Sequence, residues 1–364
     1  MMGKKIGLLT SGGDCQGLNT ALRGVAKALY EQVKGVELIG FRDGYRGLIE
    51  KDYKNMVSSD FSGILTVGGT ILGTSRQPFK QLQEPSDPQK PDGPTRQEAM
   101  MATYKALKLD GLVILGGNGT HKTAHALSQA GLNILTLPKT IDNDLWGTDV
   151  TFGFQSAVDI ATLVIDSIHT TATSHGRVFI IELMGHRAGW LTLHAGVAGG
   201  ADVILIPEIP YSIDSIARSL KQREAQHKRF SIIALAEGAL TQEEASLSKK
   251  ELRKIRELES YPSAAYRLAH DLGEKTGQEI RVTVPGHFQR GGQPVAFDRV
   301  LATTLGTAAA DFVRDNRYGC MVGLVNNQTV AVPLEEVAGK LKKVPEDSII
   351  IRSARAIGTC FGDD

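Results

Sequence analysis

A short segment, PKTIDND at residues 138–144, places a lysine and two carboxylates where a buried strand is predicted to end. It follows the apolar run LNILTL and leads into a stretch rich in turn-forming residues. A carboxylate beside a phosphate group can act as a general base for a hydroxyl, or it can hold Mg²⁺. Asp142 and Asp144 could divide these roles, one accepting a hydroxyl proton and the other coordinating metal or orienting water. The alternative is an Asx-turn with two solvated aspartates.

Two glycine-rich turns have the composition of phosphate-binding loops. Gly12 and Gly13 follow the apolar run KKIGLLT, and GGNGT at 116–120 follows VIL and precedes a helical pattern. Glycine lets the backbone approach phosphate oxygens, helix N-termini point free N–H groups at anions, and Thr120 is expected to add a hydroxyl at the helix N-cap. Neither turn has the GxxxxGK[ST] or GxGxxG pattern, which disfavours a P-loop or a dinucleotide site.

Repeated strand–turn–helix units must position these turns. Continuous apolar runs alternate with helical periods, which predicts parallel strands covered on both faces and an α/β fold. The predicted strands are KKIGLLT, GLVILGG, NILTLPKT, RVFIIELMG, DVILIPE, FSIIALAEG and EIRVTVPGH. The segment 18–33 is predicted to be an amphipathic helix, because its apolar residues recur at i, i+3 and i+4.

Two polar segments interrupt this pattern. Residues 81–94 hold four prolines and are predicted to be an exposed loop, which Thr95 and Glu98 follow as a capping box. Residues 241–260 are dense in charges of both signs and are predicted to be a solvated helix.

Length and composition restrict the class of protein. The 364 residues suit two α/β domains, and the net charge of +1 argues against binding nucleic acid or a membrane surface through bulk electrostatics. No apolar run approaches the ~20 residues of a membrane span. Three widely spaced cysteines, outside any C-x-x-C pattern, indicate free thiols in a reducing cytoplasm.

Taken together, the motifs resemble those of the phosphofructokinase family. They are TSGGD, GGNGT, PKTIDND, ELMG followed by GW, AGGAD followed by PE, and GHFQRGG, and the match runs in the family's order from about Lys5 to about Asp311. The resemblance implies two packed Rossmann-like three-layer domains with parallel-rich sheets and an active site in the cleft between them. The expected phosphoryl-donor domain is 1–153 plus about 289–339, and the expected sugar-phosphate domain is 154–288 plus about 340–364.

The activity that the resemblance implies is Mg²⁺-dependent phosphoryl transfer to the 1-hydroxyl of fructose 6-phosphate. Asp142 is then the general base, Asp144 supports Mg²⁺ or the transition-state geometry, and Thr140 contacts the sugar or the transferred group. The family's MGR arginine is displaced, so either His186 or Arg187 could approach that group. The positions matching sugar-phosphate contacts are Arg177, Met184, Gly185, His186, Glu237, Arg281, His287 and Arg290.

The positions matching the donor site are Gly12, Gly13, Arg76, Gly117, Asn118, Gly119, Thr120 and Lys139. Asn118 replaces a family aspartate that lies near Mg²⁺, so it loses a charge but keeps an oxygen ligand. Gly119 is the residue compatible with ATP, whereas Lys139 is associated with pyrophosphate-dependent members. Steric exclusion is harder to circumvent than an added cation, so ATP is the predicted donor, with pyrophosphate as the alternative. A weakly active regulatory paralogue is a third interpretation.

Assembly and regulation also follow from the resemblance. In this family Arg177 and Arg281 reach in from a neighbouring subunit, which implies a homo-oligomer, a dimer or a tetramer. Arg23, Lys27 and Lys228 match basic positions of the family's effector site. On a helix such as 18–33, Arg23 and Lys27 are also what an ordinary solvated face would show.

Overall fold

The computed structural model describes residues 3–258 and 260–363. Contacts divide the chain into two compact units. Unit 1 comprises the chain up to Ile141, Leu145–Ser156 and Arg290–Leu341. Unit 2 comprises Asp142–Asp144, Ala157–Gln289 and the chain from Lys342 onward.

Unit 1 is built on a seven-stranded sheet with the order β11-β10-β5-β4-β1-β2-β3. The inner strands are parallel, and the two edge strands, β3 and β11, pair antiparallel with their neighbours. The strands are β1 (Lys5–Ser11), β2 (Glu37–Phe41), β3 (Tyr53–Met56), β4 (Gly111–Gly116), β5 (Ile134–Pro138), β10 (Cys320–Val325) and β11 (Gln328–Pro333).

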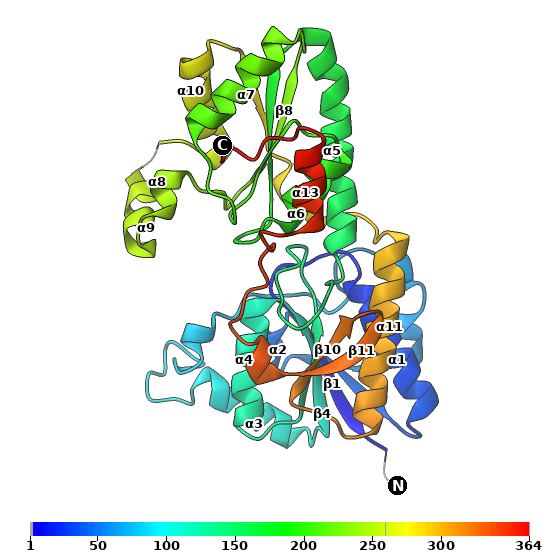
Figure 1. Ribbon diagram of the computed structural model, residues 1–364. Coiled ribbons are helices and arrows are strands. Elements are labelled where there is room, and N and C mark those ends of the chain that lie inside the picture. Colours follow the sequence, from blue (N-terminus) through cyan, green and yellow to red (C-terminus); the bar gives the residue numbers. More distant parts are fainter. Residues whose placement is uncertain (1–2, 259, 364) are drawn as a thin grey trace. The chain divides into compact units, whose positions relative to one another are not determined.

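Helices cover both faces of this sheet. On one face α1 and α11 lie side by side (Figure 1), while α2, α3 and α4 pack apolar side chains against the other. The helices are α1 (Leu18–Gln32), α2 (Tyr45–Glu50), α3 (Arg96–Ala106), α4 (Asn118–Gln129), α11 (Ala296–Arg314) and α12 (Leu334–Val337), with 3₁₀ turns η1 (Ser58–Phe61), η2 (Ile64–Thr66) and η3 (Phe79–Gln81).

Unit 2 has a four-stranded parallel sheet with the order β7-β8-β6-β9. Its core packs α7 and α10 on one face, and Figure 1 shows α5, α6 and α13 on the other side of β8. The elements are α5 (Phe154–His175), β6 (Val178–Leu183), α6 (Trp190–Ala198), β7 (Val203–Leu205), α7 (Ile213–Ala225), β8 (Ser231–Ala236), α8 (Gln242–Ala245), α9 (Lys249–Leu258), α10 (Ala264–Thr276), β9 (Ile280–Thr283), η4 (Gly286–Arg290) and α13 (Ile349–Ala356).

The fold class and the seven predicted strands are confirmed, as is the capping box of Thr95 and Glu98 at α3. The strands β2, β3, β10 and β11 were not predicted. The single helix predicted over 241–260 is wrong, because the chain forms two helices, α8 and α9. Ser248 N–H donates to Glu251 Oε2 at 2.9 Å, so a new capped helix start separates them.

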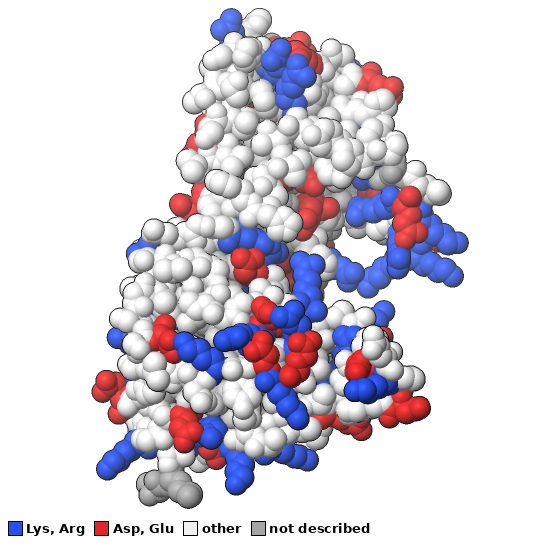
Figure 2. All heavy atoms as spheres, turned by 180° about the vertical axis from the view of Figure 1, so that it is seen from behind, with Lys and Arg blue, Asp and Glu red and all other residues white. Residues whose placement is uncertain are grey.

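The surface carries both signs of charge. On the face drawn in Figure 2, lysines and arginines lie among aspartates and glutamates. Among residues 3–258 and 260–363, no helix combines the length and apolar character that a membrane span requires.

Candidate active site

Three predicted turns lie side by side at the carboxyl edge of the unit 1 sheet. The strand register pairs Ser11 with Gly116 and Gly116 with Pro138, so β1, β4 and β5 end at the same level. The turns that follow these strands therefore share one edge, where open α/β sheets bind ligands. The structure thus brings the two glycine turns and the PKT segment together.

The first turn is held by the loop that contains Arg76. Gly12 has φ 89°, its N–H donates to Ser75 O at 3.0 Å, and its carbonyl accepts from Thr74 Oγ1 at 2.7 Å. The left-handed conformation explains glycine at this position. Arg76 comes directly after Ser75 and is exposed, so its guanidinium is available to an anion at this turn.

The second turn forms the N-terminus of α4. Gly117 is the N-cap residue, and its carbonyl accepts from both the backbone N–H of His121 at 3.1 Å and His121 Nδ1 at 2.8 Å. A carbonyl only accepts, so Nδ1 carries the proton. Burial is the main cause that lowers the pKa of His121 to about 4, so this side chain is neutral near pH 7.

Gly119 and Thr120 have different environments within this turn. A Cβ added at Gly119 would have no atom within 4 Å, so the space in front of the helix start is open. The prediction that Thr120 caps the helix is wrong, because Gly117 holds that position. Thr120 is buried instead, and its hydroxyl donates to Ser11 O at 3.4 Å, which ties the second turn to the end of β1.

Asn118 contacts a segment far along the chain. Its Nδ2 donates to Lys340 O at 2.7 Å. The amide nitrogen must face that carbonyl, because a carbonyl cannot donate. The amide oxygen of Asn118 is therefore the atom that remains suited to a cation.

The third turn buries its lysine. Lys139 is 3% exposed, its N–H donates to Gly116 O at 3.0 Å, and its ammonium donates to Gly13 O. Thr140 is also buried, and its carbonyl accepts from Thr151 Oγ1 at 2.7 Å. The positive charge of Lys139 thus lies against the backbone of the first turn.

The carboxylates follow directly and group with unit 2. Asp142 is partly exposed and Asp144 is 5% exposed. Asn143, between them, has φ 51°, and its Oδ1 accepts from Lys342 Nζ at 3.0 Å. The two aspartates therefore flank a left-handed residue, which asparagine tolerates better than most.

A second group of predicted residues meets at the carboxyl ends of β6 and β8 in unit 2. Leu183 pairs with Ala236, so Met184 and Glu237 follow adjacent strand ends. His186 N–H donates to Glu237 Oε1 at 2.8 Å, and His186 has φ 52°. Gly185 has φ 142°, another backbone conformation that favours glycine. The side chains of His186 and Arg187 are both exposed.

Arg177 and Arg281 share one carboxylate. Arg177 Nε lies 2.6 Å from Glu279 Oε2, and Arg281 Nη2 pairs with Glu279 Oε1. Arg281 lies in β9, and Arg177 directly precedes the adjacent strand β6, so their proximity follows from the sheet register. His287 lies in η4 and is exposed.

Arg290 lies in unit 1, against the first glycine turn. Its Nη1 donates to Asp14 O at 3.0 Å, and a Cβ at Gly13 would come within 2.9 Å of the same atom. Gln16 Nε2 donates to Gly291 O at 2.6 Å, so a second hydrogen bond joins the segment after the first turn to the residues around Arg290. A side chain at position 13 would therefore displace the guanidinium that packs on this glycine.

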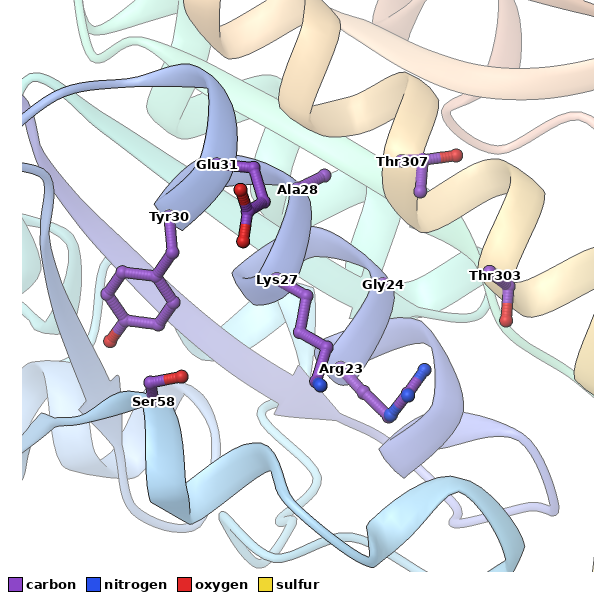
Figure 3. A pocket seen from close by; sticks show the side chains of 9 residues that line it. All are labelled: Arg23, Gly24, Lys27, Ala28, Tyr30, Glu31, Ser58, Thr303 and Thr307. Carbon is purple, nitrogen blue, oxygen red and sulfur yellow. The ribbon is translucent and has the colours of Figure 1, made fainter.

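The predicted effector residues line cavities in separate units. Arg23 and Lys27 of α1 line a cavity of about 290 Å³ together with Glu31, Ser58 and Thr307 (Figure 3). Lys228 lines a cavity of about 570 Å³ in unit 2 that also includes Arg177.

Any Mg²⁺ site here would be a minimal one. Within the described ranges, no three His, Cys, Asp or Glu side chains gather closely enough to hold a metal ion. Mg²⁺ commonly uses one or two carboxylates together with water and substrate phosphates, rather than a full protein cage. Asp144 and the amide oxygen of Asn118 are oxygen ligands of that kind, so each fits the ion by its own chemistry.

Sequence reasoning missed several residues that hold these loops. Gln289 is fully buried and its Oε1 accepts from Met184 N–H at 3.3 Å, while Glu208 accepts from Gly189 N–H at 3.0 Å. Asp298 accepts from Ser156 N–H at 2.7 Å and so caps the first turn of α5 from another helix. Gln289 lies in the GHFQRGG motif and Glu208 in the PE pair that follows AGGAD, so the motifs could have pointed to these two residues.

The sequence profile of the family described as Phosphofructokinase matches residues 5–313. A protein of Spirochaeta thermophila named ATP-dependent 6-phosphofructokinase is 56% identical, with 99% of this chain and 98% of that protein aligned. A protein of the same name from Propionibacterium freudenreichii subsp. shermanii is 48% identical over all of both chains.

A similar fold occurs in a solved structure. Phosphofructokinase from Pichia pastoris, solved in the T-state, superposes with a TM-score of 0.78 at 31% identity. The superposition covers 93% of this chain and 35% of that one, so this chain spans about a third of its length.

Proposed function

Because the chain belongs to the phosphofructokinase family, we propose that it is an ATP-dependent 6-phosphofructokinase. It transfers the γ-phosphoryl group of ATP to the 1-hydroxyl of fructose 6-phosphate, and the products are fructose 1,6-bisphosphate and ADP. This phosphorylation is a step of glycolysis. The observation that carries the proposal is the alignment of three phosphate-suited turns at one sheet edge, with the carboxylates directly after the third.

The residues that act on the acceptor hydroxyl lie in the segment TIDND, residues 140–144, which is called the TIDND turn below. Asp142 is partly exposed, so it is accessible to a substrate hydroxyl, and it accepts the proton of the 1-hydroxyl as that oxygen attacks phosphorus. Asp144 is nearly buried and supports the metal or the transition-state geometry. Thr140 contacts the sugar or the transferred group. Arg187 and His186 are both exposed, and either one stabilises charge on the transferring phosphoryl group.

The donor site is formed by the first two turns. The backbone N–H groups at the start of α4 and the exposed Arg76 bind phosphate oxygens. Asp144 and the amide oxygen of Asn118 are the groups that would hold Mg²⁺, and the ion would supply positive charge to the donor phosphates.

ATP is the preferred donor because the start of α4 is open. A side chain at position 119 would project into unoccupied space, and glycine leaves that space for a nucleotide α-phosphate. The close relatives named as ATP-dependent also support this choice. Lys139 supports the alternative donor, pyrophosphate, although its ammonium is partly engaged by Gly13 O.

The sequence-based division stays a proposal: residues 1–153 with about 289–339 bind the phosphoryl donor, and residues 154–288 with about 340–364 bind the sugar phosphate. The sugar contacts are Met184, Gly185 and Glu237, and His287 and Arg290 bind the 6-phosphate. Arg177 and Arg281 act on the site of a neighbouring subunit in a homo-oligomer, and Arg23, Lys27 and Lys228 bind an anionic effector.

We also propose that the protein acts in the cytoplasm. Cys15, Cys320 and Cys360 are free thiols in the structure. Free cysteines are typical of reducing compartments, where disulfides rarely persist.

The test is formation of fructose 1,6-bisphosphate from fructose 6-phosphate and Mg²⁺, with ATP, ADP and pyrophosphate offered in parallel. We expect turnover with ATP. Turnover with pyrophosphate alone would reverse the donor assignment. Binding of ATP and fructose 6-phosphate without turnover on any donor would favour a regulatory paralogue.

A further inference from the structure

The segment Lys340–Lys342, outside every motif noted in the sequence, contacts two of the proposed active-site loops. Lys340 O accepts from Asn118 Nδ2 at 2.7 Å, and Leu341 forms an isolated bridge with Leu145. Lys342 N–H then donates to Asp144 O at 2.9 Å. Lys340 thus contacts the second glycine turn, Leu341 contacts the residue that follows the TIDND turn, and Lys342 contacts the TIDND turn itself.

The side chain of Lys342 adds a contact to the same turn. Its Nζ donates to Asn143 Oδ1 at 3.0 Å, so side chain and backbone of one residue hold two successive positions. Asn143 is left-handed at φ 51°. Asparagine tolerates this conformation better than most residues, and contacts with its neighbours can hold it there. The hydrogen bond from Lys342 is a contact of this kind.

Lys342 is itself fixed by an aromatic ring. Its carbonyl accepts from Trp190 Nε1 at 3.0 Å, and its Nζ lies 5.4 Å from the centroid of the Trp190 ring. An ammonium at this distance is attracted by the face of an indole. The flexible lysine stem is therefore held at both ends, so that its ammonium is presented to Asn143 in a defined place.

We propose that Lys342 is a positioning residue of the TIDND turn. By holding Asn143 in its left-handed conformation and Asp144 through its carbonyl, it sets the directions in which Asp142 and Asp144 present their carboxylates. The inference rests on the proposed phosphotransferase function, because the orientation of Asp142 affects the rate only if Asp142 is the base. Lys342 acts through Asn143 and does not itself contact the reacting atoms.

The test compares Lys342→Met with Lys342→Arg and with the neighbouring Lys343→Met. Methionine keeps an apolar stem against Trp190 but loses the donor, whereas arginine keeps a cationic donor. Since small misplacements of a catalytic group can cost about a hundredfold, we expect Lys342→Met to lower kcat by roughly 10- to 100-fold. KM for ATP and for fructose 6-phosphate should stay within about twofold, because the ligand contacts are unchanged. Lys342→Arg should recover most of the loss, and Lys343→Met, at an exposed position, should match the wild type.

Hydrogen exchange provides a readout that does not depend on turnover. In Lys342→Met the peptide covering residues 140–146 should exchange faster, while that peptide is unchanged in Lys343→Met. A rise in either KM with unchanged kcat would mean that Lys342 binds a ligand directly, which overturns the inference. Unchanged kcat and unchanged exchange would also overturn it. If the wild type lacks turnover with every donor, the proposed function fails instead, and the exchange result alone decides the positioning role.

Discussion

At the residue scale, Asp142 and Asp144 share one short turn but differ in exposure. Asp142 is partly exposed and Asp144 is 5% exposed. A general base must be reached by the hydroxyl it deprotonates, whereas a carboxylate that supports metal or geometry functions within a buried network. The difference in exposure therefore agrees with the assignment of the base to Asp142.

Replacing Asp142 with asparagine should remove the base while keeping the size and most of the hydrogen bonding. We expect kcat to fall by about 10²- to 10⁴-fold, with fructose 6-phosphate binding nearly unchanged. Steady-state kinetics and calorimetric titration of the sugar phosphate measure the two effects. Asp92→Asn, in the exposed proline-rich loop, is the control and should behave as the wild type. Equal turnover in Asp142→Asn would rule out the assigned base.

His121 should make the stability of the protein depend on pH. Burial lowers its pKa from 6.5 to about 4. The unfolded chain then binds more protons than the folded chain between these values, so stability falls as the pH drops from 6.5 to 4. The loss by pH 4 should reach at most about 3 kcal/mol. Urea unfolding of wild type and His121→Leu at pH 7, 5 and 4 measures it. The variant should lack this part of the acid dependence, and identical pH profiles would contradict the prediction.

At the element scale, glycines allow helices to approach one another in one place and weaken a helix in another. Gly306 of α11 packs on α1, where an added Cβ would lie 2.7 Å from Ala21 O and 2.9 Å from Val25 N. These are backbone atoms, which cannot move aside as a flexible side chain can. In α10, a Cβ at Gly273 would meet no atom within 4 Å.

The two glycines should respond to alanine in opposite ways. Gly306→Ala should destabilise the protein by about 1–3 kcal/mol, because the helices must separate. Gly273→Ala should stabilise it by about 0.5–1 kcal/mol through the higher helix propensity of alanine. Thermal unfolding of the two variants provides the comparison. Stabilisation by Gly306→Ala would show that α1 and α11 are not in close backbone contact.

At the scale of the whole molecule, the proposed site is divided among segments far apart in the sequence. Asn118 and Lys340 are 222 positions apart, and Asn143 and Lys342 are 199 apart. The segment that follows the strands of both sheets in the sequence therefore returns to the earlier loops. The proposed roles of Arg177 and Arg281 extend this division to a second subunit.

Subunit mixing tests whether one subunit completes the site of another. Asp142→Asn and Arg281→Ala should each be nearly inactive alone. Co-refolding the two should restore about a quarter of wild-type activity in a dimeric pairing, because some sites receive both intact residues. Mixing Asp142→Asn with Glu237→Ala is the control, since both residues are assigned to the same subunit's site and no intact site can form. No recovery in the first mixture would place the arginines in their own subunit's site or outside any site.

The sequence by itself determined the features that depend on local order. Apolar runs defined the parallel strands, glycine turns marked their carboxyl ends, and Thr95 with Glu98 marked a helix start, because each depends on neighbouring residues. Tertiary structure alone decided that Arg290 packs on Gly13, that Asp298 caps α5, and that residues 340–342 hold the loops. Several of these contacts end on backbone carbonyls or N–H groups. Every residue type except proline carries both groups, so no sequence pattern marks the partner.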